Sequence, residues 1–342
     1  MPTLIFTKSQ LVGKGSTGYL INLLVKFPLA HPTRVTHCSL FPILMRKVFW
    51  LSLLIISLLV VLLFSSQNKA GHINYSVANT LPEAKLIYQS HQLDSSIVHT
   101  LLIPISSGFV MKTASSEQLI PVENFAQQHQ ALAVINGGFF DPNNQKTTSY
   151  IVQEGQLVAD PRLNEGLMDN PSNAPYLDKI LNRTEFRRYR CGSSFRYDIV
   201  LHSEATPEGC ILLDALGGGP RLLPALTLFQ EGFLDFEDGK VTLDALGTKR
   251  PNARSAVGIT PEGNILLVMA AQKTELPQNS GVSLPELAEF MKSFGVEEAM
   301  NLDGGSSSAL YYQGETFYGR VTQDGNRVKR PIKSVILVIK SK

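Results

Sequence analysis

After residue 84, apolar and polar side chains alternate in short, regular patterns. The first of these patterns predict two strands, a helix and a third strand that ends in paired glycines. Residues 85–89 and 97–103 are rich in β-branched and apolar side chains, which predicts two strands. Residues 121–129 place apolar side chains three and four positions apart, which predicts a helix. Residues 131–135 predict a short apolar strand that runs into Asn136 and two glycines.

A similar unit of helix, strand and paired glycines occurs later in the chain. Ser283 and Glu286 fit a capping box that begins a helix, and Gly295 is placed to end it. Residues 299–302 then predict a strand that leads into Asp303. Four more strands are predicted, at residues 211–216, 255–259, 264–270 and 334–339. Because strands and helices do not alternate strictly, the pattern predicts an α+β fold with a mixed β-sheet and packed helices, a single large domain over residues 84–342.

The longest apolar run lies before this domain, at residues 48–64 (VFWLSLLIISLLVVLLF). As a helix the run would span about 26 Å, close to the thickness of a bilayer core. Arg46 and Lys47 precede it, which predicts a cytoplasmic start and a domain on the outer, periplasmic or extracellular side. We therefore expect a signal anchor over residues 45–65, or secretion if this segment is a cleaved signal peptide.

Two segments flank the anchor. Residues 66–83 are polar and are interpreted as a linker. Residues 1–44 show no pattern, and Met45 stands directly before the basic pair, so we interpret residues 1–44 as an extension added by a start assigned too early.

Charge is distributed unevenly around the same segment. Six of the 31 Lys and Arg residues lie before residue 65, whereas none of the 29 Asp and Glu residues does. The formal net charge of +2 therefore hides a mildly acidic domain. Because phosphate backbones are bound by clustered excess cations, this distribution argues against a nucleic-acid partner.

Two of the three cysteines, Cys191 and Cys210, follow the apolar run. In an exported domain such a pair is compatible with a disulfide bond. Two unrelated small residues are an equally acceptable interpretation, since spacing alone does not establish the geometry of a bridge.

Three glycine-rich turns carry the polar side chains that could perform chemistry. The turns begin at Gly137, Gly217 and Gly304, and each follows an apolar strand. The glycines of such a turn can simply allow the positive φ angles of a tight turn, or the N–H groups of the turn can approach an anionic ligand. The polar residues beside the turns are Asn136, Asp141, Arg221, Asn301 and Asp303, and Arg254 precedes the strand at 255–259. Arginine with carboxylates and amides suits an anionic, hydroxyl-rich substrate.

Other kinds of site are not supported. The phosphate-binding and dinucleotide-binding glycine motifs, the GxSxG and HExxH motifs and CxxC pairs do not occur. The histidines after the apolar run, His202 among them, lack the spacing of zinc ligands. The basic cluster that includes Arg183, Arg187 and Arg188 is interpreted as a solvated face, with contact to an anionic glycan as the alternative.

Four segments in order resemble the phosphodiester glycosidase family, and the resemblance covers about residues 130–340. They are Ile135–Phe140 (INGGFF), Leu216–Leu223 (LGGGPRLL), Ala253–Gly258 (ARSAVG) and Asn301–Ser307 (NLDGGSS). The resemblance implies hydrolysis of a sugar-1-phosphodiester at the anomeric carbon, through an oxocarbenium-like state that a carboxylate stabilises. On envelope glycan or glycoconjugate, such an enzyme would release the sugar and leave a phosphomonoester.

The resemblance also implies roles for individual residues. Asp303 would be the nucleophile or electrostatic stabiliser, Asp141 a second carboxylate, and Arg254 a catalytic residue that holds the phosphate. The expected substrate-binding residues are Asn136, Gly137, Gly138, Gly218, Gly219, Arg221, Asn301, Gly304, Gly305 and Ser306. The resemblance does not imply a definite cofactor, and the Asp- and Asn-rich turns allow a Ca²⁺ or Mg²⁺ ion.

The chain departs from the family pattern at two places. Ser306 stands where the family often has a third glycine, and Ala271-Gln272 stand where it often has Gly-Arg. The alternative function is therefore a non-catalytic module that binds or assembles envelope polysaccharide with the same residues.

Overall fold

The computed structural model describes residues 85–341. The expected anchor over residues 45–65, the linker at 66–83 and the extension at 1–44 lie outside the described residues. Residues 85–341 belong to one compact unit, which agrees with a single large domain. None of the helices between residues 85 and 341 has the length and apolar character needed to cross a membrane.

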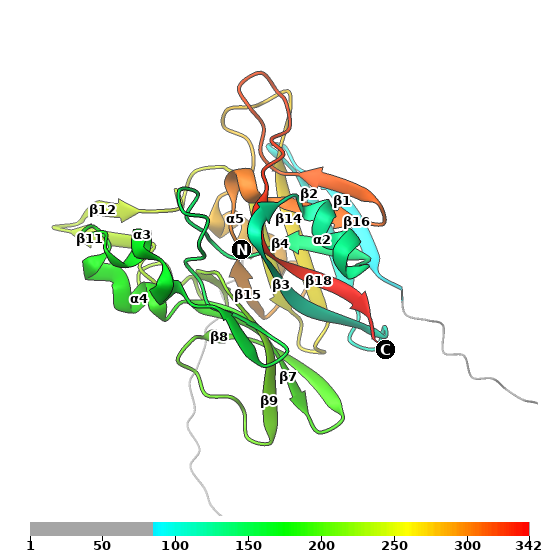
Figure 1. Ribbon diagram of the computed structural model, residues 1–342. Coiled ribbons are helices and arrows are strands. Elements are labelled where there is room, and N and C mark those ends of the chain that lie inside the picture. The colour runs from blue at the N-terminus through cyan, green and yellow to red at the C-terminus, as the bar shows by residue number, and fades with distance from the viewer. Residues whose placement is uncertain (1–84, 342) are drawn as a thin grey trace, which may run out of the picture. The chain divides into compact units, whose positions relative to one another are not determined.

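Three β-sheets make up most of the domain (Figure 1). The first sheet has six strands, in the order β1 (Ile87–Gln92), β2 (Ser96–Ile103), β14 (Ile265–Gln272), β13 (Arg254–Ile259), β15 (Glu298–Asn301) and β10 (Arg221–Leu223). The second has five, in the order β17 (Glu315–Tyr318), β16 (Ala309–Tyr312), β4 (Ala133–Asn136), β18 (Ile332–Lys340) and β3 (Phe109–Ile120). The third has five, in the order β6 (Gln156–Ala159), β5 (Ile151–Gln153), β9 (Cys210–Gly217), β7 (Thr184–Cys191) and β8 (Ser194–Leu201).

Two longer helices and several short elements complete the domain. The longer helices are α2 (Val122–His129) and α5 (Leu284–Lys292). The short ones are α3 (Glu165–Met168), α4 (Leu177–Leu181) and the 3-10 turns η1 (Pro161–Leu163), η2 (Ala174–Tyr176) and η3 (Gly305–Ser307). A hairpin of β11 (Leu234–Glu237) and β12 (Lys240–Asp244) projects from the same side of the domain as α3 and α4 (Figure 1).

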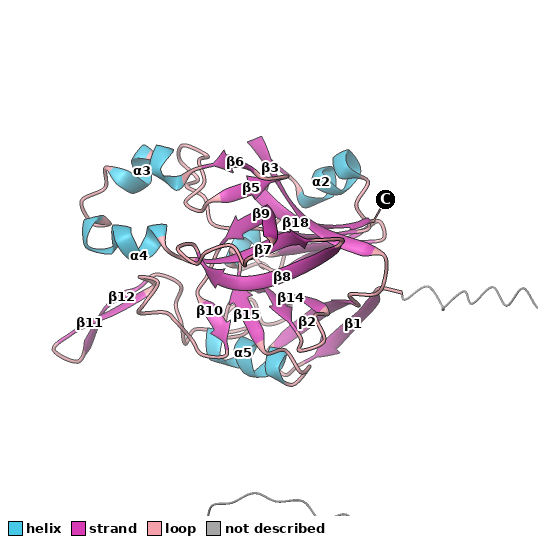
Figure 2. Cartoon of the chain, turned by 90° about the horizontal axis from the view of Figure 1, so that it is seen from below, coloured by secondary structure: helices cyan, strands magenta, loops and turns pink. Residues whose placement is uncertain are grey.

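One face of each sheet packs against a shared core. Leu101 of the first sheet, Ile135 of the second and Phe186 of the third belong to the same buried cluster. The outer face of the first sheet is covered by α5 and that of the second by α2, which lie on opposite sides of the domain (Figure 2). Because the helices also bury these two outer faces, the central strands are buried on both sides, and their sequences are nearly continuous apolar runs.

Strand β14 illustrates how the sequence pattern becomes two packed layers. Leu267 and Met269 point into the shared core, whereas Leu266 and Val268 point toward α5. Since side chains alternate between faces along a strand, an unbroken apolar segment has both faces buried. The predicted strands and both predicted helices are confirmed with small shifts of their ends, and Ser283 and Glu286 form the expected capping box.

The expectation of a mixed sheet is wrong. All strand pairings between residues 85 and 341 are antiparallel. Helices occupy few of the connections, so few parallel crossovers could form. The domain is therefore mostly β, with helices confined to the outer faces and to the segment between β6 and β7.

The third sheet contains strands that the sequence pattern did not predict. Strand β7 reads TEFRRYRC, and its first six residues are all buried. Arg187 pairs with Glu185 at 2.7 Å, and Arg188 pairs with Asp214 at 2.5 Å. The interpretation of Arg187 and Arg188 as part of a solvated face is therefore wrong, because ion-pair partners, on the same strand for Arg187 and on β9 for Arg188, allow these charges to be buried.

A disulfide bond joins Cys191 at the end of β7 to Cys210 at the start of β9. The two residues are directly opposite each other in the antiparallel pairing of these strands. Of the two interpretations of this cysteine pair, the structure supports the bridge.

Candidate functional site

The glycine-rich turns meet where the ends of several strands come together. Asn136 ends β4, Gly217 ends β9, Arg254 begins β13, and Asp303 follows β15. Because Asn301 lies opposite Ala256 in the pairing of β15 with β13, the start of one strand and the end of the other share one edge. Residues far apart in sequence therefore form one contiguous site.

Asn136 lies at the centre of this site and is fully buried. Its Nδ2 donates a hydrogen bond of 2.6 Å to the backbone oxygen of Asp303. Its Oδ1 accepts one of 2.6 Å from the Ser255 hydroxyl and one of 3.1 Å from the Ala309 N–H. Because the protein satisfies both ends of the amide, Asn136 joins four segments and positions the Asp303 turn.

The Gly137-Gly138 turn packs tightly against its neighbours. The Asp303 N–H donates to the Gly137 oxygen at 2.9 Å, which continues the link made by Asn136. A Cβ atom on Gly138 would lie only 2.1 Å from the Gly217 oxygen. Close approach of two backbones therefore requires glycine at position 138.

Asp303 is the candidate catalytic carboxylate and is half-buried. Burial raises the pKa of Asp303 to about 6, against the combined opposing effects of the Ser307 hydroxyl, the Arg330 charge and the Gly304 N–H. The carboxyl group therefore exchanges its proton near neutral pH, which is typical of acids and nucleophiles in active sites.

Arg330 is a site residue that the sequence analysis missed. Its Nη1 donates to the Ser306 hydroxyl at 2.9 Å, and its guanidinium lies 4.8 Å from the centre of the Phe140 ring. Its charge also acts on Asp303. In the sequence Arg330 belongs to a basic segment before β18, and no local signal distinguishes it from an exposed charge.

Arg254 lies beside the Asp303 turn and is almost fully buried. Its Nε and Nη2 donate to the backbone oxygens of Val282, Gly247 and Arg250. Burial lowers the pKa of Arg254 to about 10. Its Nη1 makes no hydrogen bond with residues 85–341 and lies 3.9 Å from where a Gly304 Cβ would be. One nitrogen thus remains available next to the turn.

The Gly217-Gly219 turn is held against the same strand end. Gly219 N–H donates to the Asn301 oxygen at 2.8 Å, and Asn301 Nδ2 returns a bond of 3.0 Å to the Gly219 oxygen. Gly218 N–H donates to Thr184 on β7. Asn301 is buried, and its Oδ1 has no hydrogen-bond partner within the described chain.

A buried carboxylate, Glu231, fixes this turn and was not predicted. It accepts hydrogen bonds from the backbone and hydroxyl of Thr184, from the Arg221 N–H and from the Thr227 hydroxyl. A Cβ on Gly219 would lie 2.3 Å from Glu231 Oε2, and Gly219 has a φ of +94°, so the turn requires glycine there.

The remaining turn residues are placed as follows. Gly305 N–H donates to the Ala253 oxygen at 2.7 Å, which packs the Gly304-Gly305 turn against the start of β13. The structure thus brings together Asn136, Gly137, Gly138, Gly218, Gly219, Arg254, Asn301, Asp303, Gly304, Gly305 and Ser306.

Two predicted residues are directed elsewhere. The Asp141 carboxylate accepts from the Asn143 N–H at 2.8 Å and lies against Gly166 of α3. Arg221 donates from Nη2 to the Ile199 oxygen of β8 at 2.7 Å. Within residues 85–341 neither side chain makes a hydrogen bond to the Asp303 turn, so their roles in the site stay predictions.

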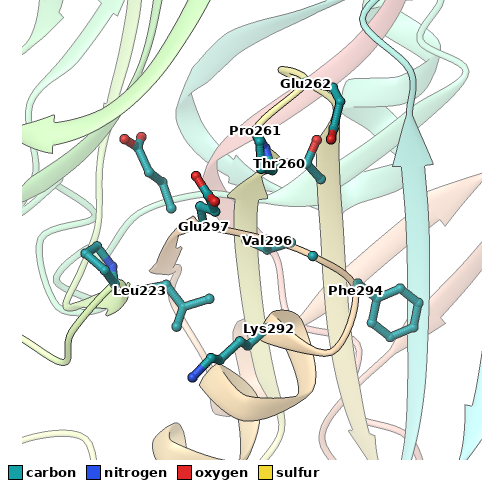
Figure 3. A pocket seen from close by; sticks show the side chains of 11 residues that line it. Leu223, Thr260, Pro261, Glu262, Lys292, Phe294, Val296 and Glu297 are labelled. Atoms are coloured by element: carbon teal, nitrogen blue, oxygen red, sulfur yellow. The ribbon is translucent and has the colours of Figure 1, made fainter. Parts of the chain in front are cut away.

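Two cavities differ in their relation to this site. One of about 650 Å³ adjoins it, because Ser306 lines it together with the polar residues Gln272, Asn279 and Arg320. Another of about 890 Å³ lies beyond the far end of β13, at Thr260, and is also lined by Leu223 and Lys292 (Figure 3). The second cavity is therefore separated from Arg254 by the length of β13.

Histidine, cysteine and acidic side chains do not gather in groups of three suited to a metal ion anywhere in residues 85–341. The Ca²⁺ or Mg²⁺ ion that the turns allowed stays a prediction.

Comparison with solved structures identifies proteins whose chains align with this one. The catalytic domain of zebrafish N-acetylglucosamine-1-phosphodiester alpha-N-acetylglucosaminidase, a structure auto-inhibited by its pro-peptide, has a TM-score of 0.52 and 18% identity. The alignment covers 74% of this chain and 82% of that one. A hypothetical protein from Synechocystis aligns over 74% of this chain and 61% of its own, with 17% identity and a TM-score of 0.47. At 18% identity the similarity to the zebrafish domain concerns the fold alone.

Sequence comparison gives the family. The mouse N-acetylglucosamine-1-phosphodiester alpha-N-acetylglucosaminidase is 41% identical over 63 residues, a match that spans 18% of this chain and 12% of the mouse protein. The model of the phosphodiester glycosidase family matches residues 129–339, which include every residue of the site described above. This chain belongs to the phosphodiester glycosidase family.

Proposed function

We propose that this chain hydrolyses a sugar-1-phosphodiester at the anomeric carbon, releasing the sugar and leaving a phosphomonoester. The observation that carries the proposal is the Asp303 carboxyl group, whose pKa of about 6 leaves it ionised at neutral pH. A carboxylate beside the anomeric carbon stabilises the positive charge of an oxocarbenium-like transition state, by contact or as a nucleophile.

Two arginines flank Asp303 and suit the phosphate. Arg254 presents Nη1 beside Gly304, while its other nitrogens are anchored to backbone oxygens. Arg330 lies over Phe140 and reaches Ser306. Guanidinium groups fixed in this way stabilise the negative charge that develops on a departing phosphate without reorganising during the reaction.

The cavity next to Ser306 supports a hydroxyl-rich substrate. Its lining combines the exposed amides of Gln278 and Asn279 with the guanidinium of Arg320. Amide groups both donate and accept hydrogen bonds, which suits the hydroxyls of a glycan. We therefore propose an envelope glycan or glycoconjugate as the substrate class.

The proposed place of action is outside the cytoplasmic membrane, with attachment through residues 48–64 or secretion after cleavage. The Cys191–Cys210 disulfide supports export, because structural disulfides persist mainly in oxidising compartments.

The test is a turnover assay of the full chain on an N-acetylglucosamine-1-phosphodiester, with and without EDTA. We expect free N-acetylglucosamine and a phosphomonoester to appear together without ATP. Saturable binding of the substrate without turnover would instead favour the non-catalytic polysaccharide-binding module. If the chain neither binds nor turns over this substrate or isolated envelope glycan, both proposed functions are overturned.

Removing the charge of Arg330 is expected to shift the pH dependence of this reaction. The guanidinium favours the ionised form of Asp303, so an Arg330→Gln variant should raise the pKa of that carboxyl above its present value of about 6. The loss of activity on acidification should then begin at a higher pH than in the wild type. Initial rates measured over the acidic and neutral range check this.

The matched control for this prediction is Arg196→Gln, which removes an exposed arginine that pairs with Asp198. Its pH profile should coincide with that of the wild type. An Arg330→Gln profile that also coincides with the wild type would contradict the proposed link between Arg330 and Asp303.

A further inference from the structure

A second cluster of ionisable side chains lies on β7 and on the segment after β8. At its centre is Glu185, whose side chain is only 2% exposed. Its Oε2 accepts from Arg187 Nε at 2.7 Å, and its Oε1 lies 2.6 Å from His202 Nδ1. A buried carboxylate that contacts one ring nitrogen fixes the orientation of the imidazole.

Three further contacts hold His202 in place. Arg187 donates to the backbone oxygens of His202 and Glu204, at 2.7 Å each. The backbone N–H of His202 donates to the Arg183 oxygen at 3.1 Å. The Tyr150 ring stacks on the imidazole with centroids 3.7 Å apart and planes 4° apart. The ring is therefore positioned by a carboxylate, by stacking and by its own backbone.

The other ring nitrogen, Nε2, is left available. It makes no hydrogen bond with residues 85–341, and 38% of the His202 side chain is exposed. An imidazole with one nitrogen held by a carboxylate and the other free is the arrangement that transfers protons in many enzymes.

This cluster adjoins the candidate active site through the Gly217 turn. Glu185 is directly opposite Gly217 in the pairing of β7 with β9, and the Gly217 N–H donates to the Tyr150 oxygen at 2.9 Å. Gly138, which leads from the Asn136 end of the site, packs against the Gly217 oxygen. A continuous series of contacts thus joins His202 to Asp303.

The charges around His202 nearly balance. Glu185 and Arg187 face it from β7, and Asp160 and Arg162 face it from beyond Tyr150, with the Arg162 guanidinium 5.9 Å from the Tyr150 ring centre. The pKa of Asp160 is lowered mainly by its hydrogen bond to Arg162 and further by the charge of protonated His202. With two acids and two bases in place, protonation of His202 gives the cluster a net positive charge that suits an anion.

We propose that His202 binds the substrate phosphate through Nε2 and donates its proton to the oxygen that leaves the anomeric carbon, an inference that rests on the proposed hydrolysis. The bond between C1 and the phosphate oxygen breaks, and its electron pair remains on that oxygen, which takes the proton of Nε2. Water then adds its hydroxyl to C1 and returns its second proton to Nε2. Glu185 and Tyr150 are positioning residues that orient the ring.

The first test needs no turnover. The imidazole signals of the full chain are followed by NMR as inorganic phosphate is added. We expect saturable changes in the His202 signal, assigned with a His202→Gln variant, and none for the exposed His129 of α2. A His202 signal that is insensitive to phosphate, or that changes only in parallel with His129, would overturn the proposal.

The second test is kinetic. His202→Gln should lower kcat about 10²–10⁴-fold and change the limb of the pH–rate profile on which activity falls as the general acid loses its proton. Glu185→Gln should disturb the same limb, and His129→Gln should leave the profile unchanged. Thermal melting checks that each variant is folded. A folded His202→Gln enzyme with an unchanged profile contradicts the inference and leaves the proposed hydrolysis intact. A wild type without turnover contradicts the hydrolysis, and the phosphate titration still decides whether His202 binds the anion.

Discussion

Replacing Asp303 by asparagine should reduce hydrolysis of a sugar-1-phosphodiester on the order of 10³-fold, the scale seen when a group that stabilises transition-state charge is removed. Asparagine keeps the size of the side chain but cannot carry the negative charge that an oxocarbenium-like state requires. The measurement is kcat/KM at neutral pH, where Asp303, with its pKa of about 6, is largely ionised.

The stability of the same variant provides the control for folding. Because burial raises the pKa of Asp303 from 3.8 to about 6, the native state binds this proton more tightly than the unfolded chain does. The contribution of Asp303 to stability is therefore most favourable below pH 3.8 and is lost as the pH rises through about 6.

At neutral pH the Asp303→Asn protein should consequently melt no lower than the wild type. Asp94→Asn, at an exposed position in the β1–β2 turn, should leave both activity and melting unchanged. A folded Asp303→Asn protein that retains full turnover would contradict the central role of this carboxylate.

Replacing Asn136 by alanine should lower the free energy of unfolding by about 3 kcal/mol, since three hydrogen bonds are lost and their buried partners are left without substitutes. The partners are the Asp303 oxygen, the Ser255 hydroxyl and the Ala309 N–H. Because Asn136 holds the turn that carries Asp303, turnover of the folded fraction should fall as well. Urea unfolding followed by circular dichroism gives the first quantity, and initial rates give the second.

The matched control is Asn143→Ala, which removes an exposed amide from the neighbouring turn and should change stability little. A Ser255→Ala variant isolates one of the three bonds. Combined with Asn136→Ala in a double-mutant cycle, it should show a coupling energy, because the two side chains are in direct contact at 2.6 Å. An Asn136→Ala protein as stable as the wild type would show that the buried amide does not hold the turn.

Much of the fold could be predicted from local patterns. Strand β14 is apolar on both faces because the shared core lies on one side and α5 on the other. Helix α5 begins at the capping box of Ser283 and Glu286, whose partners are three residues apart. Elements of this kind are specified by neighbours in sequence, so periodicity and capping residues were sufficient to identify them.

The same patterns were insufficient for the third sheet. Strand β7 carries Glu185, Arg187 and Arg188 at positions that are buried, and a polar segment of this kind resembles an exposed loop. Burial became favourable because Asp214 of β9 and His202, in the segment after β8, supply partners for Arg188 and Glu185, while Arg187 pairs with Glu185 on its own strand. The absence of parallel pairing between residues 85 and 341 likewise depends on how whole strands are connected.

The sequence by itself determined the glycine-rich turns, the residue types at the candidate site and membership of the phosphodiester glycosidase family. Only the tertiary structure decided that Asn136 positions the Asp303 turn, that Arg330 acts on Asp303, and that Glu185 orients His202. The physical reason is that turns and strands depend on residues near in sequence, whereas hydrogen bonds and charges in a site depend on distances across the fold. Asn136 and Ser255 are 119 positions apart in the chain, and their side-chain oxygens lie 2.6 Å apart.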